Sequence, residues 1–182
     1  MSQKTNNILK TLHIVSWMLF IGVCIEAGGF IFNAFSTLLI DPIHANKFWL
    51  NVDLSELYQN NQSQFITVIF LMIVVAFLRA VMFYMIVKLF NNKKLHLSKP
   101  FNEDIQHFIL NIAYLALAIG LFSFCATLFT QKLVHEGISI PDLQYLRLAG
   151  ADVWLFMGIA LLIIAYFFKK AIELQNENDL TV

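Results

Sequence analysis

Four long runs of apolar residues dominate the chain, and short polar segments separate them. The runs cover approximately 11–40, 65–90, 105–130 and 148–170. Each is long enough to cross a hydrocarbon layer of about 30 Å at about 1.5 Å per residue. Because backbone groups inside lipid must satisfy their own hydrogen bonds, the runs are predicted to be transmembrane α-helices. The pattern predicts an all-α, polytopic membrane protein: one domain over 1–182, with four helices in a bundle.

Two local features refine these boundaries. A helix over 11–40 would be about 45 Å long, so we expect it to tilt, to protrude or to bend near Gly28 and Gly29. The segment 139–142, Ser-Ile-Pro-Asp, has the proline that helices favour in their first turn. The last helix is therefore expected to start outside the membrane and to continue inward through Arg147.

The composition agrees with a membrane protein and excludes other classes. Hydrophobic residues make up 59% of the chain and charged residues 13%, with a mean hydropathy of +0.70. Soluble domains are nearer about 45–50% apolar and about 25% charged. The segments outside the runs are too short to build a core, which excludes a separate soluble catalytic or DNA-binding domain. Since there is no room for a catalytic domain, the protein is predicted not to be an enzyme. Basic and acidic residues balance, twelve against twelve, so no direct nucleic-acid binding is expected.

Basic residues indicate the orientation of the helices. Eight lysines lie at the two termini and around the 91–104 loop, whereas Lys47, Lys132 and Arg147 lie on the opposite side. Short cytoplasmic loops carry an excess of lysine and arginine in membrane proteins. This asymmetry predicts that the N and C termini are both cytoplasmic.

Three ionisable residues fall inside the apolar runs: Glu26, Arg79 and Asp152. Such residues cost about 2.5–3.5 kcal/mol on insertion scales, so they usually face a bundle and have partners. Helical rise places Glu26 about 21 Å and Arg79 about 16 Å from the cytoplasmic ends of their helices, and Asp152 higher, at about 25 Å. The leading interpretation is an ion pair between Glu26 and Arg79, with Asp152 at the membrane edge. The alternative is a small ion- or proton-coupled transporter that uses Glu26.

Histidines suggest a remote alternative, a membrane haem protein. His13 and His107 lie near the cytoplasmic boundary, where two neighbouring helices could present them to a haem. Haem ligands usually lie inside a bundle, however, so no cofactor is predicted. His44 and His135 lie in the opposite loops without HExxH or a comparable signature, so no metal site is predicted.

The end of the chain carries a family resemblance. From Ala160 to Val182 it reads ALLIIAYFFKKAIELQNENDLTV, an apolar helix end followed by two lysines and a polar tail. It resembles the C-terminal signature of the bacterial domain of unknown function 2975 family, with its basic pair, E-L-Q-like turn and D-L-T-V-like terminus. The segment 99–102, Lys-Pro-Phe-Asn, is a second match, and the resemblance extends over the four-span layout. Members commonly carry arginines where this chain has cytoplasmic lysines.

The resemblance implies a bacterial inner-membrane protein with no established catalytic residues, often encoded beside a small helix-turn-helix regulator of the Cro/CI type. We therefore predict a non-enzymatic protein that acts through protein contacts, as a sensor or as the partner of a cytoplasmic regulator. The lipid bilayer is its first partner, and self-association stays open because the chain has no GxxxG motif. The predicted contact surface is the C-terminal tail, comprising Lys169, Lys170, Glu173, Leu174, Asp179, Leu180 and Val182.

Overall fold

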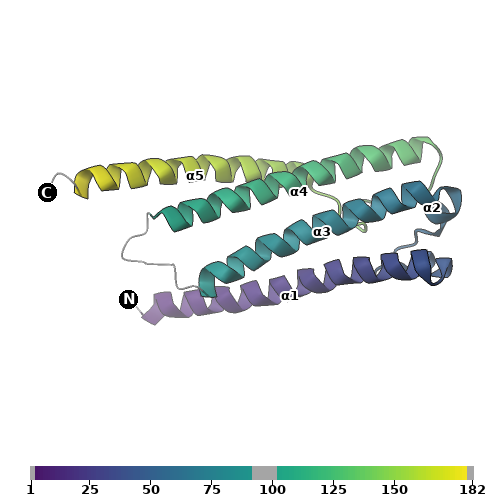
Figure 1. Ribbon diagram of the computed structural model, residues 1–182, viewed down its shortest axis with the longest axis horizontal. Helices are drawn as coiled ribbons and strands as arrows, with labels where there is room; N and C mark the ends of the chain where they lie inside the picture. The colour runs from purple at the N-terminus through teal and green to yellow at the C-terminus, as the bar shows by residue number, and fades with distance from the viewer. Residues whose placement is uncertain (1–2, 92–101, 180–182) are drawn as a thin grey trace.

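Four long helices build the protein. The computed structural model describes residues 3–91 and 102–179. The long helices, shown in Figure 1, are α1 (Gln3–Leu39), α3 (Gln62–Asn91), α4 (Glu103–His135) and α5 (Ala151–Asp179). Two short elements, the 3₁₀ helix η1 (Pro42–Lys47) and α2 (Ser55–Asn60), connect α1 to α3. All four long helices have the length and apolar composition to cross a membrane. The predicted all-α bundle of four membrane-type helices is confirmed.

The long helices are neighbours in chain order. α1 packs against α3, α3 against α4, and α4 against α5. In Figure 1 both chain termini lie at the same end of the bundle, which we call the terminal end. The opposite end, which holds η1 and α2, is the loop end. The cytoplasmic location of the terminal end stays a prediction.

α1 continues without interruption through Gly28 and Gly29, near which a bend was one of the expected possibilities. Gly29 instead permits a close approach, because the indole ring of Trp49 lies where a Cβ atom at this position would stand. The same indole meets the ring of the fully buried Phe30 edge-on, with centroids 5.9 Å apart. The segment after η1 is thereby packed onto α1.

Aromatic packing also holds the loop end together. The ring of Phe65, near the start of α3, is fully buried and meets the rings of Phe48 and Tyr58 edge-on at 6.3 and 5.0 Å. Beside it, the carboxylate of Asp53 accepts hydrogen bonds from the hydroxyl and the backbone N–H of Ser55, at 2.6 and 2.9 Å. These two bonds hold the pKa of Asp53 below its usual value. Asp53 therefore stays ionised at the start of α2.

Two glycines bring α4 and α5 close together. A Cβ atom at Gly120 would stand 2.7 Å from the side chain of Leu155, and one at Gly158 would stand 2.7 Å from that of Leu117. Both contacts agree with one antiparallel alignment of the helices, in which Gly120 lies opposite Leu155 and Leu117 lies opposite Gly158. In this register α5 begins opposite the middle of α4, and its last turns extend beyond the start of α4 at the terminal end (Figure 1).

The connection between α4 and α5 differs from the prediction. Residues 139–142 do not start a helix, and α5 begins only at Ala151. A turn forms first, in which the N–H of Leu146 donates to the carbonyl of Asp142 at 3.2 Å. The backbone then reaches φ +59° at Arg147, a left-handed conformation that ends a helical path. Leu146 and Leu148 are fully buried, and Arg147 between them is exposed. Buried and exposed side chains therefore alternate here, instead of following the repeat of a helix.

Candidate functional site

Charged and aromatic side chains from four segments meet beside the α4–α5 connection. α1 contributes Glu26, α3 contributes Arg79, the connection contributes Arg147, and α5 contributes Trp154. We call these four residues the arginine cluster. The buried leucines on either side of Arg147 fix the connection against the bundle, so the left-handed backbone at this arginine is held in place. Such a backbone costs on the order of 1 kcal/mol for a residue with a Cβ atom.

The ion pair of the cluster joins Glu26 to Arg147. The Nε atom of Arg147 lies 3.7 Å from Oε1 of Glu26, whose side chain is 23% exposed. We predicted that Glu26 pairs with Arg79, but the ion pair in the structure joins Glu26 to Arg147. Arg79 is attracted electrostatically to Glu26 and repelled by Arg147, so all three charges belong to one cluster.

Arg79 is positioned by an aromatic ring from the last helix. Its guanidinium carbon lies 5.6 Å from the ring centroid of Trp154, a cation–π distance. Within the described residues, its Nε atom is buried without a hydrogen-bond partner, and so is Oε1 of Glu26. A hollow of about 310 Å³ opens beside these groups, lined by Arg79, Gln144, Arg147 and Ala149. The cluster therefore combines two guanidinium groups, one carboxylate and an adjacent open space.

Asp152 was the third residue predicted for an intramembrane site. It is exposed on the first turn of α5, two residues before Trp154. Its participation stays a prediction.

We expect Glu26→Gln to lower the free energy of unfolding by about 1 kcal/mol, since two guanidinium groups lose their counter-charge in a partly exposed pair. Thermal unfolding in detergent micelles measures the change. The double variant Glu26→Gln/Arg147→Gln should lose less than the sum of the two single losses, because both charges then leave together. A double variant whose loss equals or exceeds the sum of the single losses would contradict the pairing.

Ion- or proton-coupled transport would require Glu26 to exchange its partner during a cycle. The Nε atom of Arg147 instead lies 3.7 Å from this carboxylate, and Arg79 adds a second electrostatic attraction. The geometry does not favour the transporter alternative.

The predicted contact residues at the terminal end lie on the last turns of α5. Nζ of Lys170 is 2.7 Å from Oε2 of Glu173, and Leu174 is 61% exposed. Lys169 and Glu173 line a hollow of about 300 Å³ between α5 and the first turns of α4. Asp179 ends α5. Leu180 and Val182 lie outside the described residues.

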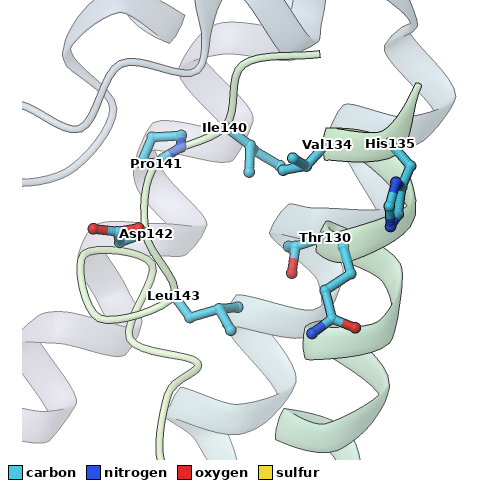
Figure 2. Close-up of a pocket in the computed structure, with 8 residues that line it drawn as sticks. Thr130, Val134, His135, Ile140, Pro141, Asp142 and Leu143 are labelled. Atoms are coloured by element: carbon cyan, nitrogen blue, oxygen red, sulfur yellow. The ribbon is translucent and has the colours of Figure 1, made fainter. Parts of the chain in front are cut away.

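Figure 2 shows another hollow, of about 220 Å³, between the end of α4 and the α4–α5 connection. Ile140 points toward Val134 across it, whereas the carboxylate of Asp142 points away from α4. Its lining is Thr130, Gln131, Val134, His135, Ile140, Pro141, Asp142 and Leu143. Because few of these groups are charged, the hollow is a weaker candidate than the arginine cluster. Across 3–91 and 102–179, no group of three or more His, Cys, Asp and Glu side chains is suited to hold a metal ion.

The haem alternative requires two histidines on neighbouring helices. His13 lies on α1, where its Nε2 accepts a hydrogen bond from the indole N–H of Trp17 at 3.0 Å. His107 lies on α4, and α3 stands between α1 and α4 in the bundle. The described helices α1 and α4 are therefore not neighbours, although the haem alternative requires them to be.

The fold and these contacts define a class of protein, a helical bundle with four helices of membrane-spanning length. Within that class, the family model DUF2975, described as a protein of unknown function, matches residues 40–182. The chain belongs to this family, as its C-terminal signature predicted. The matched range includes Arg79, Arg147 and the tail, and it begins directly after α1, which carries Glu26. Comparisons with curated proteins and with solved structures found no match.

Proposed function

We infer that this chain is a non-enzymatic protein of the bacterial inner membrane. It acts through protein contacts at its terminal end, as a sensor or as the membrane partner of a cytoplasmic regulator of the helix-turn-helix type. The two termini then lie in the cytoplasm, as the lysine distribution predicts. The observation that carries the proposal is the projection of α5 beyond the other helices (Figure 1).

The projection follows from the register of α5 on α4. Gly120 lies against Leu155 and Leu117 against Gly158, and the same antiparallel register places Ile172 of α5 opposite Glu103, the first residue of α4. Residues 173–179 therefore continue past the start of α4, which corresponds to about 10 Å of helix. A helix end that projects from a bundle is accessible to a soluble partner.

The chemistry of the projecting turns suits recognition by a protein. Leu174 is largely exposed, and it follows the ion pair between Lys170 and Glu173 directly in the chain. Lys169 and Lys170 are suited to hold the helix at anionic head groups, which would leave the following turns in water. Helices that dock into a groove do so through apolar anchor side chains, and Leu174 offers such a side chain.

Photo-crosslinking tests this function. A crosslinking amino acid at position 174 of the full-length protein in intact cells should capture a soluble helix-turn-helix protein, identified by mass spectrometry. The matched control is position 153, where Val153 is 63% exposed near the opposite end of the same helix. A C-terminal reporter that is active only in the cytoplasm should also be active.

Equal capture at both positions, or capture of lipid alone at position 174, would contradict the proposal. Leu174→Asp supplies an independent check, since a charge in place of the apolar anchor should abolish capture by a probe at position 170. Undiminished capture in that variant would exclude Leu174 as the anchor.

A further inference from the structure

The hollow beside Arg79 and Arg147 has the chemistry of an anion site. Two of its four lining side chains are guanidinium groups, which stay protonated in proteins, and Gln144 adds a neutral amide. A second hollow of about 390 Å³ shares Gln144 and Arg147 with the first and is otherwise lined by Leu50, Val52 and Tyr145. Arg147 thus lines two accessible spaces before the start of α5.

The charges of the cluster do not balance internally. Glu26 supplies one negative charge against the two arginines, and the arginines repel each other. The 3.7 Å separation between Glu26 and Arg147 exceeds a good hydrogen-bond length, so this contact leaves guanidinium donors available. The cluster therefore carries one excess positive charge and directional N–H donors beside a hollow.

Trp154 contributes an aromatic ring beside the guanidinium of Arg79. The indole lies within cation–π distance of the guanidinium of Arg79, and in the described chain Nε of this arginine has no hydrogen-bond partner. A guanidinium that stacks through its face keeps its in-plane donors, which match the spacing of oxygen atoms on a phosphate or carboxylate. A contact at cation–π distance is not a hydrogen bond to an acceptor atom, so it is compatible with donation from Arg79 to an oxyanion.

We propose that Arg79, Arg147 and Gln144 bind a singly charged phosphate group, supplied either as free inorganic phosphate or as the phosphodiester of an anionic lipid. The two arginines donate to its oxygen atoms from α3 and from the α4–α5 connection. Glu26 offsets one of the two positive charges of the site, which suits a monoanion better than a multiply charged ligand. This site is separate from the contact surface at the terminal end.

The purified full-length protein in neutral detergent allows both sources to be tested. One arm adds inorganic phosphate, with chloride at equal ionic strength as the control. The other arm adds phosphatidylglycerol, with phosphatidylcholine as the control, and native mass spectrometry counts the bound lipid. Binding should raise the melting temperature in at least one arm, because a ligand that binds only the folded state stabilises it. A rise with phosphate identifies the free anion, and a rise with phosphatidylglycerol alone identifies the lipid head group.

Three substitutions make the test specific. Arg147→Gln should weaken binding about tenfold or more, as expected for the loss of a charge-assisted contact. Lys132→Gln is the matched control, since it removes one exposed cation from the loop end outside the site and should leave binding unchanged. Glu26→Gln should lower the stability of the ligand-free protein and yet bind the same probe more tightly. A purely structural role of the cluster does not produce that opposite pair of effects.

The proposal fails if neither probe exceeds its control, if Arg147→Gln retains full binding, or if Lys132→Gln reduces binding as much as Arg147→Gln does. Arg79→Gln adds a second arginine test. If the Arg79→Gln variant does not fold, Arg147→Gln still decides the test, because the side chain of Arg147 is 49% exposed.

Discussion

Gly158→Leu should force α5 away from α4 and lower the free energy of unfolding by about 3 kcal/mol, the upper part of the range for overpacked sites. A Cβ atom at this position would stand 3.0 Å from the backbone nitrogen of Leu117 and 2.7 Å from its side chain. A side chain can rotate away from such a contact, but the backbone of α4 cannot. Denaturation by sodium dodecyl sulfate in mixed micelles, followed by helical circular dichroism, measures the loss.

Gly22→Leu is the matched control for this result. Gly22 lies on an exposed part of α1, and a Cβ atom there meets nothing within 4 Å. The control should keep its stability or gain up to about 1 kcal/mol, since leucine is a better helix former than glycine. Equal losses at the two positions would show that contact between α4 and α5 is not the cause.

Phe65→Ala should destabilise the loop end by about 3–5 kcal/mol, the usual cost of removing a buried aromatic ring. The ring is fully buried and touches two other rings, one on the segment after η1 and one on α2. Its removal leaves a cavity that rigid neighbours cannot fill. Thermal unfolding in micelles should show a lower midpoint.

Phe70→Ala provides the comparison for the buried ring. Phe70 lies on the same helix but is 58% exposed, so its loss should cost far less than that of Phe65. Similar losses for the two substitutions would contradict the aromatic core at the loop end.

The membrane-type helices were predictable because one physical requirement determines them. An apolar run in lipid must satisfy its own backbone, and helices are the simplest solution. The helix ends were less predictable, as the third run shows. Hydropathy placed its end near 130, whereas α4 continues to His135 through Gln131 and Lys132. Polar residues mark the limit of an apolar run, but they do not end a helix.

The arginine cluster was only half predictable. Two of the three charges inside the apolar runs, Glu26 and Arg79, were identified as residues that need partners. Arg147 was expected to lie on the last helix where it enters the membrane, because nothing in the one-dimensional pattern reveals a connection that folds back along the bundle. The useful signal was the alternation of Leu146, Arg147 and Leu148, which fits an irregular buried segment better than a helix. The proline at position 141 favoured the helical interpretation and outweighed that signal.

The attachment of α5 has a consequence for motion within the bundle. Among the described helices, α5 packs along α4 alone, whereas α3 and α4 each have two long neighbours. The contact between α4 and α5 is nevertheless the most extensive of any helix pair, and the least extensive contact between long helices joins α3 to α4. The partial opening that breaks the fewest contacts therefore separates α4 and α5 together from α1 and α3. That opening would carry Trp154, near the start of α5, away from Arg79. It would also shift the exposed turns around Leu174, near the other end of the same helix. One helix thus links the arginine cluster mechanically to the terminal end of the molecule.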